Sequence, residues 1–175
     1  MCIPVAKCGV FLYAIYMSEL HPGAPAPAFH AVAGGGAYGD GTPVSLSDFA
    51  GQNVVLYFYP KDDTPGCTTQ ACGLRDIWGE LSKEAVVFGV SIDPEKSHRK
   101  FINKFELPFA LLSDTKQELV QAYGVWVEKS MYGKTYMGAE RSTFVINGEG
   151  ILKAVLRKVK PAEHAQQVLD ALRLS

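Results

Sequence analysis

The stretch VVLYFYPKDDTPGCTTQAC, residues 54–72, combines the composition of a strand, a turn and the start of a helix. Residues 54–59 form an unbroken apolar run rich in β-branched and aromatic side chains, which is typical of a strand buried on both faces. Pro60 ends the run, and turn-forming residues fill positions 62–66. Apolar residues then recur at helical spacing, which predicts a helix over residues 67–82.

A second buried strand is predicted over residues 85–92, AVVFGVSI, directly after that helix. Asp93 and Pro94 end this strand and favour the start of another helix over residues 95–105. Two buried strands separated by a helix form a βαβ unit, in which the strands are parallel and the crossover is right-handed.

Shorter patterns predict the remaining elements. They are a strand over residues 109–112, a helix over 117–123, strands over 142–146 and 151–156, and a helix over 161–172. Asn147-Gly148, between the last two strands, is typical of a hairpin turn. A parallel βαβ half followed by an antiparallel hairpin and a closing helix predicts an α/β, thioredoxin-like fold with a central mixed sheet flanked by helices.

The segments upstream of residue 54 carry no strand pattern of this kind. Residues 21–29 are rich in proline and are interpreted as an extended lead-in, and residues 34–41 as a glycine-rich loop.

Composition limits the classes of function. The chain has 175 residues, of which 47% are hydrophobic, and this is enough to fill the core of one domain. The formal net charge is -1, so no overall positive field attracts nucleic acid or an anionic membrane surface. Small uncharged substrates or protein partners fit this surface better.

Residues 1–16, MCIPVAKCGVFLYAIY, differ from the rest of the chain. Their apolar run is too short to span a bilayer, and we interpret them as an extension ahead of a domain over residues 17–175. A signal peptide is the alternative, although only Lys7 supplies positive charge and no clear cleavage site follows closely. We therefore expect a cytoplasmic protein, and no catalytic role for Cys2 or Cys8.

Cys67 falls at the predicted start of a helix that follows a buried strand. Free backbone N–H groups and the positive end of the helix dipole favour an anion at such a position, so a thiolate is expected there. Thr64 precedes it by three residues, close enough for its hydroxyl to donate to the sulfur or to a substrate oxygen. Pro60 and Pro65 stiffen the turn.

Cysteines in a chain of this kind have two other common uses. A free cysteine is commonly a small buried hydrophobic residue, and on its own this would be the more frequent role of Cys67. A zinc site would need clustered ligands, but the four histidines are scattered and no second close cysteine pair exists. No metal or organic cofactor is expected.

The spacing Pro60-x-x-x-Thr64-x-x-Cys67 resembles the active-site signature of the peroxiredoxins. FYPKDDTPGCTTQAC as a whole resembles the bacterioferritin comigratory protein or PrxQ subgroup of that family. The resemblance extends from about Pro22 to the C-terminus. It continues in the segments LRD, FGVSIDP, LLSD, YGKTYMGAERSTFVI and KVKPAEHAQQVLDAL.

This resemblance implies a role for five residues. Cys67 is the peroxidatic cysteine, Thr64 and Pro60 complete its pocket, and Arg141 is the active-site arginine. Cys72 matches the resolving cysteine that this subgroup carries five residues downstream. The implied enzyme is an atypical 2-Cys peroxiredoxin that reduces hydrogen peroxide and organic hydroperoxides.

One departure from the subgroup is Gln70, where the family more often has glutamate. The absence of the glutamate carboxylate affects any hydrogen-bond network that it would share with the arginines. It leaves the nucleophile in place. A guanidinium about 4 Å from a thiolate contributes about 4 kcal/mol at an effective dielectric constant of 20, whereas a helix N-terminus contributes about 0.3 to 1 kcal/mol. Arg141 is therefore expected to be the main activator of Cys67.

The spacing of Cys67 and Cys72 predicts a conformational change. In an intact helix their Cα atoms would lie about 8.6 Å apart, with side chains pointing about 140° apart. A disulfide requires a Cα separation below about 7 Å. The helix must therefore unwind locally before the two sulfurs can join.

The reductant implied by the resemblance is thioredoxin or a glutaredoxin-like protein, and the chain is expected to act as a monomer or a weak dimer. Two alternative functions remain at this point. A redox sensor that relays oxidation to a partner would use the same cysteine pair. A thioredoxin-type disulfide oxidoreductase usually carries Cys-x-x-Cys, whereas four residues separate the cysteines here.

Overall fold

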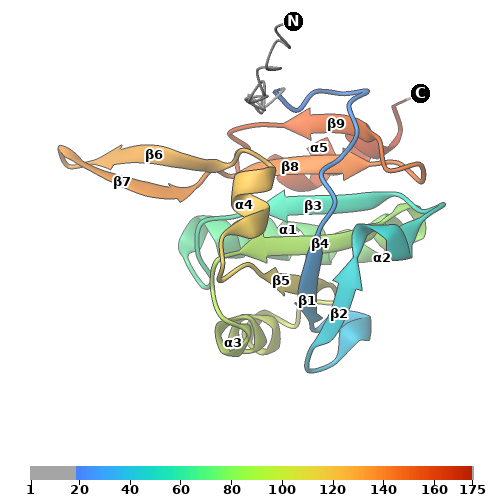
Figure 1. The fold of residues 1–175 in the computed structure, drawn as a ribbon. Helices are drawn as coiled ribbons and strands as arrows, with labels where there is room; N and C mark the ends of the chain where they lie inside the picture. Colours follow the sequence, from blue (N-terminus) through green and yellow to red (C-terminus); the bar gives the residue numbers. More distant parts are fainter. Residues whose placement is uncertain (1–18, 175) are drawn as a thin grey trace, which may run out of the picture.

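The computed structural model describes residues 19–174, so the interpretation of residues 1–16 concerns a segment outside the described residues. Seven strands form the central sheet, in the order β2-β1-β5-β4-β3-β8-β9 (Figure 1). Their bounds are β1 His30–Gly34, β2 Thr42–Ser45, β3 Val54–Phe58, β4 Val86–Ser91, β5 Ala110–Ser113, β8 Ser142–Ile146 and β9 Leu152–Leu156.

The centre of the sheet is parallel and its edges are antiparallel. Strand β4 pairs parallel with β3 and β5, while β8 runs antiparallel to β3 and β1 runs antiparallel to β5. The parallel β3–β4 pair confirms the predicted βαβ unit, and the antiparallel β8–β9 pair confirms the predicted hairpin.

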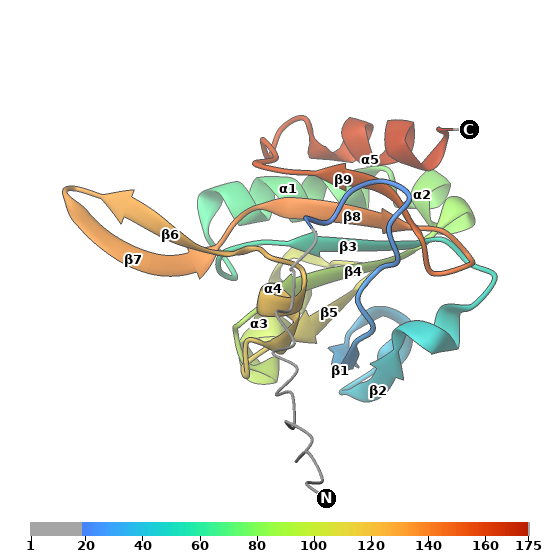
Figure 2. The same cartoon turned by 45° about the horizontal axis from the view of Figure 1, so that its top comes forward.

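Helices cover both faces of the sheet (Figure 2). They are α1 Pro65–Asp76, α2 Trp78–Glu84, α3 Glu95–Phe105, α4 Glu118–Ala122 and α5 His164–Leu172. Every residue of β3 is buried, and its side chains alternate between two cores: Val55 and Tyr57 pack with helix α5, whereas Leu56 and Phe58 pack with α4. The predicted α/β class, a central mixed sheet flanked by helices, is confirmed.

One prediction about local structure was wrong, and two strands were missed. The helix expected over residues 67–82 is two helices, because Ile77, at φ −103° and ψ 11°, ends α1 and precedes α2. Strands β1 and β2 were not predicted, and they border the segment over residues 34–41 that was interpreted as a loop. These strands are short and interrupted by glycine and proline, so they lack the alternation that identifies a strand.

A third element, the β6–β7 hairpin, was missed altogether. Strands β6 Trp126–Met131 and β7 Lys134–Ala139 pair only with each other and project from the body of the protein (Figure 1). Tyr132 and Gly133 form its turn, with φ of 52° and 74°. Positive φ at both central residues is the geometry of a type I′ turn, which the pair Tyr-Gly signals less clearly than Asn-Gly does.

Candidate active site

Strand β3 and helix α1 together fix the position of Cys67. The strand ends at Phe58, a short loop follows, and α1 begins at Pro65, with Thr64 as its N-cap. Proline suits the first helical position because its missing N–H has no partner to lose there. Cys67 lies in the first turn with 2% of its surface exposed, so its thiol is shielded from bulk water.

Arg141 reaches the sulfur from the neighbouring strand. Ser142, the first residue of β8, lies opposite Phe58 in the antiparallel β3–β8 pair, so Arg141 emerges beside the end of β3. Its Nη2 donates to Cys67 Sγ at 3.5 Å, and its Nη1 donates to Gln70 Oε1 at 2.5 Å. A guanidinium held by two partners in this way favours the charged thiolate.

Gly66 makes room for this guanidinium. A Cβ at Gly66 would lie 3.1 Å from Arg141 Nη2 and 3.5 Å from Pro161 Cγ. A side chain there would push the arginine away from the first turn of α1. The glycine of the segment Thr64-Pro65-Gly66-Cys67 is therefore part of the charge arrangement.

Thr64 and Pro60 lie beside the thiol in the chain but make different contacts from those expected. The Thr64 hydroxyl donates to the Lys61 carbonyl at 3.0 Å, within the loop, rather than to the sulfur. Pro60 is half-buried and lies two residues after the end of β3. Contact of Thr64 with a peroxide would require its hydroxyl to leave the Lys61 carbonyl.

Cys72 lies in the same helix as Cys67, one turn further on, and both thiols are free. Cys72 is half-buried, whereas Cys67 is buried. The structure thus brings Cys67, Arg141 and Gln70 together but leaves Cys72 on an intact helix.

Lys129 is a second cation near this site that the sequence analysis did not identify. Its Nζ donates to the Ala139 carbonyl at 2.5 Å, two residues before Arg141, and its aliphatic chain passes 3.4 Å from where a Cβ of Gly138 would lie. Burial lowers the pKa of Lys129, the charge of Arg141 lowers it further, and Glu140 and Cys67 oppose this. No sequence signal indicated this residue, because the hairpin that carries it was not predicted.

The layer behind the thiol contains neutral polar groups. His164 is buried, and its Nε2 lies 2.8 Å from the Thr143 hydroxyl. Burial lowers the pKa of His164 to about 3, and Arg141 adds to this effect, so the imidazole is neutral at physiological pH. Burial likewise raises the pKa of Tyr57 well above its ordinary value. The guanidinium of Arg141 therefore faces neutral rings on this side.

Residues 19–174 lack two features. In that range, no group of three or more histidine, cysteine, aspartate or glutamate side chains could hold a metal ion. The helices of the same range are all too short or too polar to cross a membrane.

Comparison with known proteins adds a family to this geometry. The sequence model of the AhpC/TSA family matches residues 22–155. A putative peroxiredoxin Bcp of Coxiella burnetii is 51% identical over 76% of this chain and 89% of that protein. Peroxiredoxin Bcp of Bacillus subtilis is 49% identical over 76% of this chain and 85% of that protein.

Solved structures give a consistent result. The bacterioferritin comigratory protein of Xanthomonas campestris, described with alkyl peroxide reduction activity, matches with a TM-score of 0.72 and 46% identity over 76% of this chain and 85% of its own. A cysteine-to-serine mutant of PrxQ from Xylella fastidiosa matches with a TM-score of 0.80 and 35% identity, over 89% of this chain and 97% of its own. The family match spans Cys67, Cys72 and Arg141.

Proposed function

This chain belongs to the AhpC/TSA family, among its Bcp or PrxQ peroxiredoxins, and we propose that Cys67 is the nucleophile with which it reduces hydroperoxides. The hydrogen bond from Arg141 to Cys67 Sγ is the observation that carries this assignment. It gives one buried thiol a cationic neighbour at the start of a helix, which stabilises the thiolate form that attacks.

The first step consumes one hydroperoxide. The Cys67 thiolate attacks one oxygen, so an S–O bond forms as the O–O bond breaks, and the leaving oxygen takes a proton and departs as water or an alcohol. In this proposal Arg141 stabilises charge on the oxygens, and Thr64 and Pro60 border the peroxide. Hydrogen peroxide and organic hydroperoxides are the proposed substrates, since alkyl peroxide reduction is described for the Xanthomonas campestris relative.

The second step forms the disulfide. The Cys72 sulfur attacks the Cys67 sulfenic acid, an S–S bond forms, the S–O bond breaks, and water leaves. Five residues of intact helix separate the cysteines by about 8.6 Å at Cα, which exceeds the reach of a disulfide. The first turn of α1 therefore unwinds in this step.

The third step returns both thiols. A dithiol protein such as thioredoxin, or a glutaredoxin-like reductant, supplies two electrons and leaves with its own disulfide. This mechanism makes the protein an atypical 2-Cys peroxiredoxin. A cytoplasmic location and a state of monomer or weak dimer remain predictions.

Mass spectrometry tests the assignment. After one equivalent of hydrogen peroxide, the reduced protein should lose two hydrogens, and peptide mapping should give a Cys67–Cys72 link. A link to Cys2 or Cys8 would contradict the resolving role of Cys72. Rapid multiple turnover with a thioredoxin system would separate this enzyme from a redox sensor, which is oxidised once and does not cycle quickly.

A further inference from the structure

A buried carboxylate–imidazole pair lies beside the loop that precedes Cys67. Asp62 is 7% exposed and His98 is 2% exposed. His98 Nδ1 lies 2.8 Å and 3.1 Å from the two carboxylate oxygens of Asp62, and the Tyr59 hydroxyl donates to one of them at 2.7 Å. We call Asp62 and His98 the anchor pair.

The hydrogen-bond partners determine the protonation of this pair. His98 Nε2 lies 3.1 Å from the Leu112 carbonyl, which only accepts, so Nε2 carries a proton. Nδ1 faces a carboxylate, so a second proton lies between His98 and Asp62. Burial alone would raise the pKa of Asp62, but the hydrogen bond and charge of His98, together with Tyr59, lower it below its ordinary value. Asp62 is therefore a buried carboxylate that accepts from His98 and Tyr59.

The anchor pair joins the loop to three other elements. The Asp62 backbone N–H donates to Asp93 Oδ2 at 2.9 Å, at the end of β4. His98 belongs to α3, and its Nε2 contacts the Leu112 carbonyl of β5. All these contacts lie outside α1, so they hold the residue three positions before Pro65 whatever the state of that helix.

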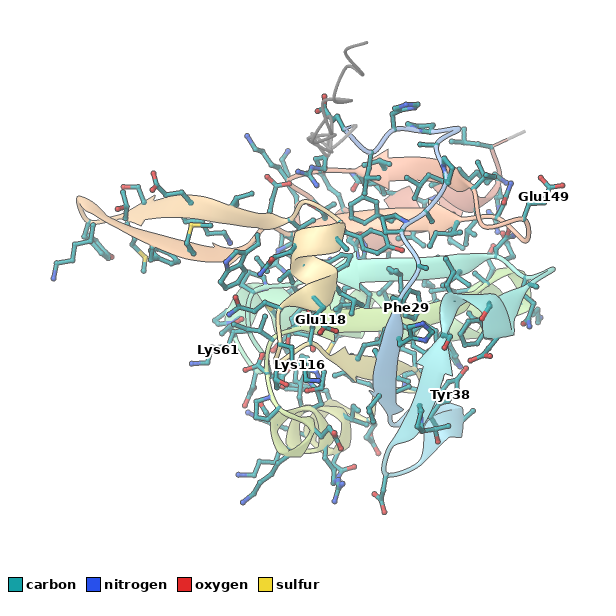
Figure 3. All side chains as sticks on the ribbon, viewed as in Figure 1. Phe29, Tyr38, Lys61, Lys116, Glu118 and Glu149 are labelled. Carbon is teal, nitrogen blue, oxygen red and sulfur yellow. The ribbon has the colours of Figure 1, made fainter. Side chains whose placement is uncertain are left out.

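The neighbouring loop residues are not held in this way. Lys61 is exposed and points away from the sheet (Figure 3). Asp63 is exposed and pairs with Lys104 of α3, at 2.7 Å. Asp62, together with Tyr59, is thus a buried attachment point of the segment between β3 and α1.

We propose that the Asp62–His98 pair is a positioning device for the peroxidase reaction. It fixes the segment before α1, keeps Cys67 beside Arg141 for peroxide attack, and sets how readily the first turn unwinds for the disulfide with Cys72. This inference rests on the proposed function, because it assigns the pair to the balance between the first and second steps.

The two steps respond in opposite directions when the pair is broken. A loosened loop moves Cys67 relative to Arg141, which slows peroxide attack. The same loosening makes the first turn of α1 easier to unwind, which speeds disulfide formation. The sulfenic acid then has a shorter life, and a second peroxide oxidises it less often to the sulfinic acid.

The test measures both steps by rapid mixing in His98→Asn and Asp62→Asn. We expect peroxide attack to slow on the order of tenfold, since a misplacement of about 1 Å can cost up to about a hundredfold. We expect the sulfenic acid to convert to the disulfide faster than in the wild type, and less mass gain of two oxygens under excess peroxide.

Two control variants separate positioning from general stability. Lys104→Gln breaks an exposed ion pair between the same loop and the same helix, and both rates should stay at wild-type values. Leu152→Ala creates a cavity in the opposite core and lowers global stability without touching the loop. It should leave the ratio of the two rates unchanged.

The proposal is overturned if His98→Asn leaves both rates unchanged, or shifts them as Leu152→Ala does. Should His98→Asn fail to fold, Tyr59→Phe removes one donor to the same carboxylate while keeping the ring. It must then shift the two rates in opposite directions by a smaller factor, and unchanged rates overturn the proposal. A wild-type protein that forms no Cys67–Cys72 link would instead overturn the proposed function.

Discussion

The Asp62–His98 pair holds the loop between β3 and α1, and Cys67 lies in the first turn of the helix that follows this loop. The polar groups around the pair and around the thiol are satisfied to different degrees. On the anchor side, the carboxylate and both imidazole nitrogens have partners. On the thiol side lie Tyr57 Oη, Gln70 Nε2 and His164 Nδ1. Within residues 19–174, these are the buried side-chain nitrogen and oxygen atoms without a hydrogen-bond partner.

The paired groups around Asp62 support the loop, whereas the unpaired groups lie around the thiol proposed to react. Each unpaired buried polar group costs about 1 to 3 kcal/mol, so a fold selected for stability alone would pair or remove such groups. They gather instead between the sheet and helices α1 and α5, in the layer that contains Cys67. Within residues 19–174, the polar groups of the Asp62–His98 pair have partners, whereas the layer around Cys67 contains the buried side-chain atoms that lack one, an arrangement typical of functional sites.

Cys67→Ser removes the proposed nucleophile and should have the largest effect of these substitutions. It should abolish peroxidase activity, because a neutral hydroxyl cannot replace the thiolate as nucleophile. Peroxide consumption with a thioredoxin system measures this, and circular dichroism checks that the fold survives. More than trace activity would contradict the assignment of Cys67.

Arg141→Lys tests whether the planar guanidinium beside Cys67 is needed in addition to its charge. A lysine keeps the charge but loses the planar fork that contacts both Sγ and Gln70, so we expect peroxide attack to slow on the order of a hundredfold. Rapid-mixing kinetics of sulfenic acid formation give this rate. A rate near that of the wild type would show that the fork is not needed.

Cys72→Ser separates attack from recycling. The first step should survive, because Cys67, Arg141 and the anchor pair are all present. Cycling with thioredoxin should be poor, and under excess peroxide Cys67 should gain two oxygens as its sulfinic acid, which ordinary thiols do not reverse. Intact-mass measurement detects this gain, and sustained thioredoxin-dependent turnover would exclude Cys72 as the resolving residue.

His164, on the thiol side, makes the free energy of unfolding depend on pH. The folded pKa of about 3 lies below the value of about 6.5 expected in the unfolded chain, so the unfolded state binds the extra proton first as the pH falls. The contribution of neutral His164 to the free energy of unfolding is complete above about pH 6.5. Below that pH it declines by up to about 1.4 kcal/mol per pH unit.

The measurement is urea unfolding of the reduced wild type and of His164→Gln across this pH range. Between about pH 6.5 and about pH 4.5, the wild type should lose roughly 2 to 3 kcal/mol more than the variant. Parallel pH dependence in the two proteins would mean that His164 is not neutral in the folded state.

Much of the fold follows from local patterns in the sequence. The buried run before Pro60, the helix over residues 95–105 and the strand over residues 142–146 were predicted where they occur, because periodicity and turn residues act over a few neighbouring positions. The break at Ile77 was not predicted, since the apolar spacing continues across it and only the backbone reveals the end of α1.

The candidate site likewise combines residues that the sequence located with contacts that only the structure revealed. Sequence alone placed Cys67 at the start of a helix after a buried strand, and the family resemblance pointed to Arg141. The sequence did not reveal that Gln70 would accept a hydrogen bond from Arg141, 71 positions away. Nor did it reveal that His98 would pair with Asp62 across 36 positions. Contacts over such separations depend on strand register and helix packing, which no local pattern encodes. The tertiary structure alone therefore decided which charges meet at the loop, while the sequence by itself determined where the loop, the helix and the thiol would be.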